Sequence, residues 1–202
     1  FSPCSDYPGL CEIIDWNASN GTLVANVSHF TTYTAIDPTI TSCGETLDTP
    51  GLVYTLNQSI NSTGTCLNVQ ANYITIDCGG KNITHTGAGS GINVNGYNST
   101  TIKNCKIFGQ QVDSNHGIHL SSSSNNTLIN NTANSNRIGI ILENSPYNNI
   151  INNSANTNRD YGVYLSGSDY NTLRNNTANT HIGESVLTAG IYLSDSDNNT
   201  VT

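Results

Sequence analysis

Residues 139–155 read GIILENSPYNNIINNSA, and residues 162–178 repeat the same layout as GVYLSGSDYNTLRNNTA. The opening motif, Gly-(Ile/Val)-x-(Leu/Val), occurs five times with spacings of 26, 22, 23 and 28 residues, starting at Gly91, Gly117, Gly139, Gly162 and Gly190. A second aliphatic column keeps the same register: Ile76, Ile102, Leu128, Ile150, Leu173 and Val201. Repeats of this length are typical of a solenoid built from stacked coils.

Three further columns follow the same period. Asparagines come two residues after the aliphatic column, at Asn104, Asn130, Asn152 and Asn175. Three residues later stand Ile107, Ala133, Ala155 and Ala178. Serines follow the Leu of the opening motif by three residues, at Ser123, Ser145, Ser168 and Ser196. Because unrelated residue types share one register, we expect equivalent residues to lie on top of one another.

The apolar pieces predict strands. They are short, β-branched and alternating, as in Ile118-His119-Leu120. Coils about 4.8 Å apart would pair each strand in parallel with its equivalent neighbour. The predicted fold is therefore all-β: a right-handed parallel β-helix over residues 40–202, preceded by a short antiparallel β element over residues 1–39.

The turns of this solenoid are expected to hold ladders of stacked asparagines, in which each side-chain amide bonds the next. The Gly before each Ile or Val is expected to supply the unusual backbone angles of a corner. Departures from the short period predict protruding loops at residues 108–116 and 179–189. Asn-rich chains can also be disordered, but the regular aliphatic columns argue against disorder here.

Charge and hydropathy exclude several classes of protein. Charged residues make up 10% of the 202 residues, and the net charge is −8. Six Lys and Arg residues cannot form a basic stripe, so nucleic acid is not an expected partner. No run of 18 apolar residues exists, so no membrane span is expected. Without an initiator Met or a signal peptide, the chain is interpreted as mature or excised.

The cysteines indicate an extracellular or cell-surface protein. All six fall in the first 105 residues without Cys-x-x-Cys spacing or a matching His cluster: Cys4, Cys11, Cys43, Cys66, Cys78 and Cys105. This pattern favours disulfides over zinc, and disulfides persist in oxidising compartments. We therefore expect a secreted chain.

Asn-x-Ser/Thr sequons support this location, because glycans belong on secreted surfaces. Five sequons belong to the repeated Asn-Asn-Thr/Ser pattern and could arise from the repeat alone: Asn125, Asn130, Asn152, Asn175 and Asn198. The other seven are the predicted glycosylation sites: Asn17, Asn20, Asn26, Asn57, Asn61, Asn82 and Asn98.

Several motifs before the Asn-rich coils carry a family resemblance. They are Cys43-Gly44, Pro50-Gly51-x-x-Tyr54-x-Leu56, Thr65-Cys66, Ile74-x-Ile76-Asp77-Cys78-Gly79-Gly80 and Thr101-Ile102-Lys103-Asn104-Cys105. Over roughly residues 40–202 the chain resembles the secreted NosD-like parallel β-helix proteins, the carbohydrate-binding and sugar-hydrolase group, especially those of archaeal cell surfaces. The resemblance is specific for the fold. This group contains lyases, hydrolases, epimerases, adhesins and surface proteins, so the resemblance does not determine the function.

The resemblance also implies disulfide pairings. It implies Cys43–Cys66 and Cys78–Cys105 across adjacent turns, and it leaves Cys4–Cys11 as a short local loop. Stacked strands place Cα atoms near 5 Å, which lies within disulfide range.

Residues 1–39 read differently from the coils. Glu12–Trp16 and Thr22–Val27 are expected strands joined by the turn 17–21, and His29–Ile36 is an expected third strand. The His-Phe-Thr-x-Tyr string resembles the closing strand of β-sandwich modules. About 39 residues are too few to bury a sandwich core alone, so this piece is expected to cap the solenoid, pack along it or use a partner chain.

The other end of the chain stops one strand into a new coil, at residues 198–202. Such a coil would offer unpaired backbone to another chain. The predicted partner is therefore a second copy, joined head to tail through the N-terminal element and the open coil. The alternative is that the chain is a fragment of a longer one.

The outward positions of the repeats suggest a candidate ligand or lateral-contact face. The x of the opening motif gives His119, Ile141, Tyr164 and Tyr192, after Asn93. Aligned exposed aromatics can bind sugar rings or the flank of another rod. The alternative is ordinary cross-strand stacking that stabilises the sheet.

An enzyme is the less favoured interpretation. A lyase would use Tyr164 or His119 as base and Arg137 as charge neutraliser, with Glu143 and Asp160 as acids. No three acids converge in the pattern, and Arg137 with Asp160 is more simply an ion pair between neighbouring coils. We therefore predict no catalytic residues.

Metal and cofactor sites are not expected either. His116-x-x-His119 would give paired ligands only if both faced one way, which strand alternation argues against. Stacked Asp169 and Asp197 could share calcium but are expected to point into water. The predicted function is a glycosylated structural subunit of a surface layer or filament; the alternatives are a carbohydrate-binding adhesin and, less favoured, a polysaccharide lyase or hydrolase.

Overall fold

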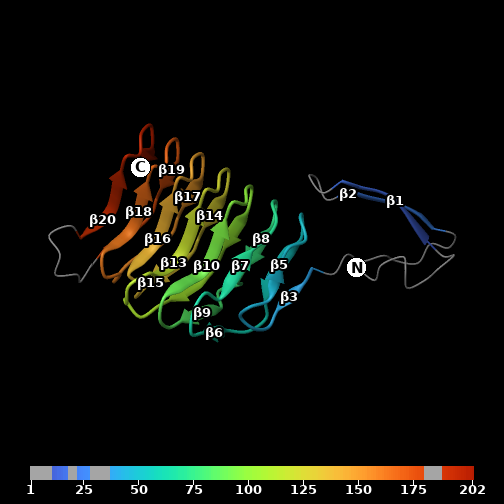
Figure 1. Ribbon diagram of the computed structural model, residues 1–202, viewed down its shortest axis with the longest axis horizontal. Coiled ribbons are helices and arrows are strands. Elements are labelled where there is room, and N and C mark those ends of the chain that lie inside the picture. The colour runs from blue at the N-terminus through green and yellow to red at the C-terminus, as the bar shows by residue number, and fades with distance from the viewer. Residues whose placement is uncertain (1–10, 18–21, 28–36, 180–187) are drawn as a thin grey trace.

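The protein forms a right-handed parallel β-helix of about six turns, as predicted (Figure 1). The computed structural model describes residues 11–17, 22–27, 37–179 and 188–202, and for the first two segments it describes the backbone alone. Every regular element within these residues is a strand. Successive coils lie side by side along the long axis of the solenoid (Figure 1).

Three parallel sheets form the walls of the solenoid. The seven-stranded sheet contains β4 (Thr46–Leu47), β7 (Leu67–Val69), β10 (Gly89–Asn95), β13 (Asn115–Ser121), β16 (Ile138–Glu143), β18 (Tyr161–Ser166) and β20 (Ala189–Ser194). The eight-stranded sheet contains β3 (Thr39–Ile40), β5 (Val53–Leu56), β8 (Thr75–Asp77), β11 (Thr101–Lys103), β14 (Thr127–Ile129), β17 (Asn149–Ile151), β19 (Thr172–Arg174) and β21 (Thr200–Val201). The four-stranded sheet contains β6 (Ile60–Ser62), β9 (Asn82–His85), β12 (Lys106–Phe108) and β15 (Thr132–Asn134).

The predicted stacking of equivalent residues is confirmed. In the seven-stranded sheet the strand partners run through Ile92, Ile118, Ile140, Val163 and Ile191 in one file. The first four of these side chains are fully buried. The eight-stranded sheet holds the second predicted column, Ile76, Ile102, Leu128, Ile150, Leu173 and Val201. Burial of these files is the main favourable contribution to the fold.

The glycines of the opening motif have a different role from the predicted one. None of the five has a φ in the left-handed region. Instead, the inner corner is too crowded for a side chain: a Cβ on Gly139 would lie 2.7 Å from the carbonyl oxygen of Gly162 and 2.6 Å from Nδ2 of Asn158. The expectation of unusual angles was therefore wrong, because close approach and not backbone strain requires glycine here.

Asparagine ladders are present, but they use the second residue of each Asn pair. Asn130, Asn152 and Asn175 have φ of 54–55° and turn the chain in the left-handed region that Asn tolerates. The next residues form the buried ladder, in which Asn153 Nδ2 donates to Oδ1 of Asn176 at 3.1 Å. The predicted serine column is confirmed, since Ser145 N donates to Oγ of Ser168 at 3.0 Å.

Both disulfides implied by the family resemblance are present. Cys43 pairs with Cys66, and Cys78 pairs with Cys105, with Cα–Cα distances of 4.6 and 4.7 Å. These distances match residues stacked in adjacent coils. The expected Cys4–Cys11 bond lies outside the residues whose side chains are described.

The N-terminal strands also agree with the prediction. β1 (Cys11–Asn17) pairs antiparallel with β2 (Thr22–Val27) in a sheet of two strands. The expected third strand, residues 29–36, lies outside the described residues. The boundary at residue 39 and the role of this piece as a cap or partner-binding segment stay predictions.

Candidate ligand-binding face

The outer face of the seven-stranded sheet gathers the most chemically varied side chains. In β13, His116 pairs with Ile138 and Ile118 pairs with Ile140, while Gly117 between them takes no strand partner. The skipped residue brings His116 and His119 onto one face, with ring centroids 5.3 Å apart. The expectation that strand alternation would separate these two histidines was therefore wrong.

The predicted face is assembled by this arrangement. One file on it runs through His119, Ile141, Tyr164 and Tyr192. A second file beside it runs through His116, Ile138 and Tyr161. Sequence reasoning missed Tyr161, although its place directly before Gly162 repeats that of His116 before Gly117 and was the available signal.

Three tyrosines form a compact aromatic cluster. The ring of Tyr161 lies 5.0 Å from that of Tyr192 and 5.1 Å from that of Tyr164, and Tyr164 lies 5.5 Å from Tyr192 (centroid distances). The rings of Tyr161 and Tyr192 are nearly parallel, at 13°. Partial burial, with Tyr192 and Tyr164 nearby, raises the pKa of the Tyr161 hydroxyl, so it stays protonated and able to donate.

Two isoleucines beside this cluster are covered despite pointing outward. Ile138 and Ile141 are only 3% and 2% exposed. Each lies between a histidine of β13 and a tyrosine of β18 in its file. The rings therefore shield an apolar strip across the middle of the face, where aromatic and aliphatic neighbours stabilise the sheet.

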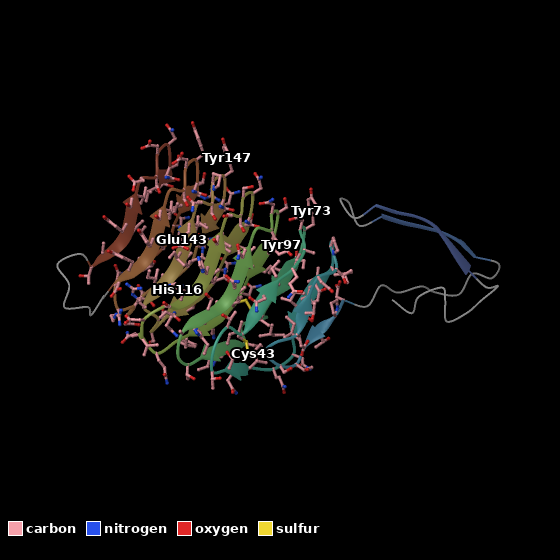
Figure 2. The ribbon with its side chains drawn as sticks, in the orientation of Figure 1. Cys43, Tyr73, Tyr97, His116, Glu143 and Tyr147 are labelled. Atoms are coloured by element: carbon pink, nitrogen blue, oxygen red, sulfur yellow. A yellow bond between two sulfur atoms is a disulfide. The ribbon has the colours of Figure 1, made fainter. Side chains whose placement is uncertain are left out.

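Next to the two histidines, the face carries one acidic side chain. His119 Nε2 lies 2.8 Å from Oε2 of Glu143, on the neighbouring strand. Burial, together with the nearby His119 and Arg137, lowers the pKa of His116 to about 4. His116 is therefore neutral at neutral pH. Figure 2 labels His116 and Glu143 on this part of the solenoid.

A charged network borders the face where strands β16 and β18 begin. Arg137 Nε donates to Asp160 at 2.6 Å, which confirms the predicted ion pair between coils. Arg159 binds the same carboxylate at 3.0 Å, and it also binds Asp113 at 2.6 Å. Asp113 lies in the loop between β12 and β13, residues 109–114, which is shorter than the predicted loop 108–116. The Asp160 carboxylate therefore lies between two guanidinium groups.

The two acids of the lyase interpretation do not converge. Tyr161 pairs with Ile138, whereas Glu143 pairs with Ser166 at the far end of the same strands. Asp160 precedes Tyr161, so at least five strand steps of about 3.3 Å separate it from Glu143, roughly 16 Å. Paired carboxylates of glycosidases are about 5–9.5 Å apart. Catalysis by these two acids as a pair is not supported by this geometry.

Residues 36–202 match the family described as periplasmic copper-binding protein (NosD). The chain belongs to the NosD family. No curated protein and no solved structure matches the chain. Membership in the NosD family and the two disulfides fit an extracellular or periplasmic location. The archaeal origin implied by the resemblance stays a prediction.

Copper sites use imidazole, thiolate or thioether ligands. The chain has no Met, and its four cysteines with described side chains are tied in disulfides. His85 is buried among amide groups of Asn115 and Asn136. No group of three or more His, Cys, Asp or Glu suited to a metal occurs among the described residues. His116 and His119 lie close together without a third ligand of this kind, so the donor set of the described residues does not fit the copper site that the family description implies. Asp169 and Asp197, which were expected to point into water, are linked directly: Asp169 Oδ1 accepts from the backbone N of Asp197 at 2.7 Å.

The predicted glycosylation sites differ in their surroundings. Asn57, Asn61 and Asn82 are exposed, whereas the half-buried Asn98 accepts hydrogen bonds from Ser124. The side chains of Asn17 and Asn26 and the whole of Asn20 lie outside the described residues. No helix long and apolar enough to cross a membrane occurs in the described parts of the chain.

Proposed function

We propose that this NosD-family chain is a non-catalytic extracellular scaffold that binds carbohydrate on the outer face of its seven-stranded sheet. The tyrosine cluster of Tyr161, Tyr164 and Tyr192 carries the proposal. It offers aromatic surface with centroid spacings of 5.0–5.5 Å beside a covered aliphatic strip. Sugar rings have apolar C–H faces that pack on such surfaces.

The polar border of the face supports a saccharide ligand. Glu143 and His119 lie at one end, and Arg137 with Asp160 lies at the other. These groups offer donors and acceptors for hydroxyls along a chain of sugars, while the aromatics provide the contact area. Because parallel strands hold the tyrosines, isoleucines and histidines of the face, little ordering of these side chains is needed on binding.

A binding measurement with matched variants tests this proposal. The purified chain should bind at least one neutral or acidic polysaccharide on a glycan array, with affinity then measured by calorimetry. Tyr164→Ala combined with Tyr192→Ala should weaken binding about five- to 140-fold, since each ring stack contributes about 0.5–1.5 kcal/mol. Tyr73→Ala, an exposed tyrosine on a turn elsewhere, is the control and should bind as the parent does. Absence of binding to every polysaccharide would overturn the proposal.

A second role is the structural subunit of a surface layer or head-to-tail filament. The observation in its favour is the unchanged register from coil to coil, as Val163 pairs with Ile191 just as Ile140 pairs with Val163. A coil of this kind can template another. Electron microscopy of the purified chain should show filaments or sheets, and dispersed monomers alone would contradict this role. Product release from acidic polysaccharides would instead favour an enzyme.

A further inference from the structure

A column of turn residues outside the proposed face adopts the left-handed backbone conformation. Six consecutive coils place a residue in the left-handed region at this turn, with φ between 56° and 61°: Tyr73, Ser99, Asn125, Tyr147, Tyr170 and Asn198. Equivalent backbone bonds link the coils, with Tyr147 N donating to Asp169 O and Tyr170 N to Asp197 O, both at 3.1 Å. Asn is tolerated in this conformation, but a bulky residue is an outlier there.

The tyrosines of the column are not needed to make the turn. Asn fills the same position at 125 and 198. A left-handed residue other than Gly or Asn is disfavoured, and one ring stack is shared between two such tyrosines. Strain that the fold does not require points to a use for the side chains.

Tyr147 and Tyr170 form a stacked pair at the surface. Their ring centroids are 5.2 Å apart and the planes differ by 8°. They remain 53% and 51% exposed, and Tyr147 projects at the upper edge of the solenoid in Figure 2. One face of each ring covers the other, so the two remaining faces are turned toward the preceding and the following coil.

In both of those neighbouring coils, the same position holds an asparagine that could accept a glycan. Asn125 precedes Tyr147 in the column, and Asn198 follows Tyr170. Both are exposed, and both begin an Asn-Asn-Thr sequon. Coil spacing is about 4.8 Å, which falls within the separation of about 4.5–7 Å between the centroids of packed rings. From the sequence alone, these two sequons are attributed to the repeat.

We infer that Asn125 and Asn198 are N-glycosylation sites whose first sugar packs on the free ring faces of Tyr147 and Tyr170. A sugar attached in the adjacent coil starts next to a ring face. The other repeat sequons lack this arrangement, because Asn130, Asn152 and Asn175 follow one another in adjacent coils of a single column. The side chain of Asn125 makes an exposed hydrogen bond, in which Nδ2 donates to Ser124 Oγ at 3.3 Å.

The modification is a group transfer from an activated donor. A lipid-linked diphosphate oligosaccharide supplies the sugar: the bond from its anomeric carbon to the diphosphate oxygen breaks, and a bond to Asn Nδ2 forms. Nδ2 loses one proton, and the diphosphate leaves with the electron pair. The acceptor asparagine must reach a transferase outside the cytoplasm. The disulfides fit an extracellular or periplasmic location, where this is possible.

Glycopeptide mass spectrometry tests the sites on the full chain, purified from a secretory host that glycosylates Asn-x-Ser/Thr. Both Asn125 and Asn198 should carry a glycan. Thr127→Val and Thr200→Val keep a β-branched residue but destroy the sequon, so each should remove the glycan from its own site alone; Thr127→Ser should retain it. Absence of a glycan from both asparagines overturns the inference, whatever the occupancy of other sequons.

Nuclear magnetic resonance tests the packing on the same material. Protons of the first sugar on Asn125 should be shifted upfield by the ring of Tyr147. Tyr147→Asn should abolish the shift while keeping a residue suited to the turn, and it creates no new sequon because Asn148 and Asn149 follow. Tyr170→Gly is the matching variant for Asn198. Occupied sites whose sugar protons are unaffected by these substitutions would overturn the packing.

Discussion

Asn131 donates twice to the side-chain oxygen of Asn153 in the next coil, from its backbone N at 2.9 Å and from its Nδ2 at 3.0 Å. Both side chains are almost fully buried. Asn153 repeats the pattern onto Asn176. Water cannot reach these buried turns, so each side-chain amide satisfies the polar groups that water would otherwise bond. The ladder is therefore part of the solenoid's core.

Asn153→Ala should therefore destabilise the fold by roughly 2–3 kcal/mol, because two buried donors of Asn131 would lose their shared acceptor. Chemical denaturation followed by circular dichroism measures the loss. The control is Asn149→Ala, at an exposed position of the same coil, which should stay within about 0.5 kcal/mol of the parent. Equal losses in the two variants would contradict a structural role for the ladder.

The crowded corner at Gly139 makes a second stability prediction. Gly139→Ala should cost about 2 kcal/mol or more, because the new methyl group would meet the backbone oxygen of Gly162 at 2.7 Å. Gly64→Ala is the matched control, since its Cβ would find the nearest atom, Ala88 O, at an ordinary 3.7 Å. Thermal unfolding of both variants distinguishes them. A Gly139→Ala protein as stable as Gly64→Ala would show that the corner can relax.

The sequence predicted the repeating architecture because burial acts on whole columns. Ile118 and Ile140 could be placed in one file from their spacing alone. It did not distinguish Asn152 from Asn153, since the turn needs one left-handed residue and one buried amide, and Asn suits both. Local contacts of single side chains, such as the Tyr147–Tyr170 stack, depend on rotamers that spacing does not encode.

The disulfides should contribute substantially to stability. Cys78→Ala with Cys105→Ala removes a cross-link between residues 27 apart, which should cost about 3–4 kcal/mol through the added freedom of the unfolded chain. Cys43→Ala with Cys66→Ala, 23 residues apart, should cost a similar amount. Urea denaturation of the two double variants measures both. A loss under about 1 kcal/mol in either would show that coil stacking alone fixes that turn.

Stability should also fall in acid because of a buried histidine. His85 is fully buried; its Nδ1 accepts from Nδ2 of Asn115 at 3.1 Å, and its Nε2 lies 3.0 Å from Oδ1 of Asn136. Burial lowers the pKa of His85 below 6.5, outweighing the opposing bond to Asn136, so the unfolded chain binds the proton more readily. The stabilising contribution is complete above pH 6.5 and is lost as the pH falls toward the folded-state pKa. His116, whose pKa is lowered to about 4 by burial and by His119 and Arg137, adds to the same trend.

Urea midpoints measured across this range should fall as the pH falls, and His85→Gln, which does not titrate, should flatten the slope. An unchanged slope in His85→Gln, with flattening only in His116→Gln, would assign the acid sensitivity to the surface histidine instead.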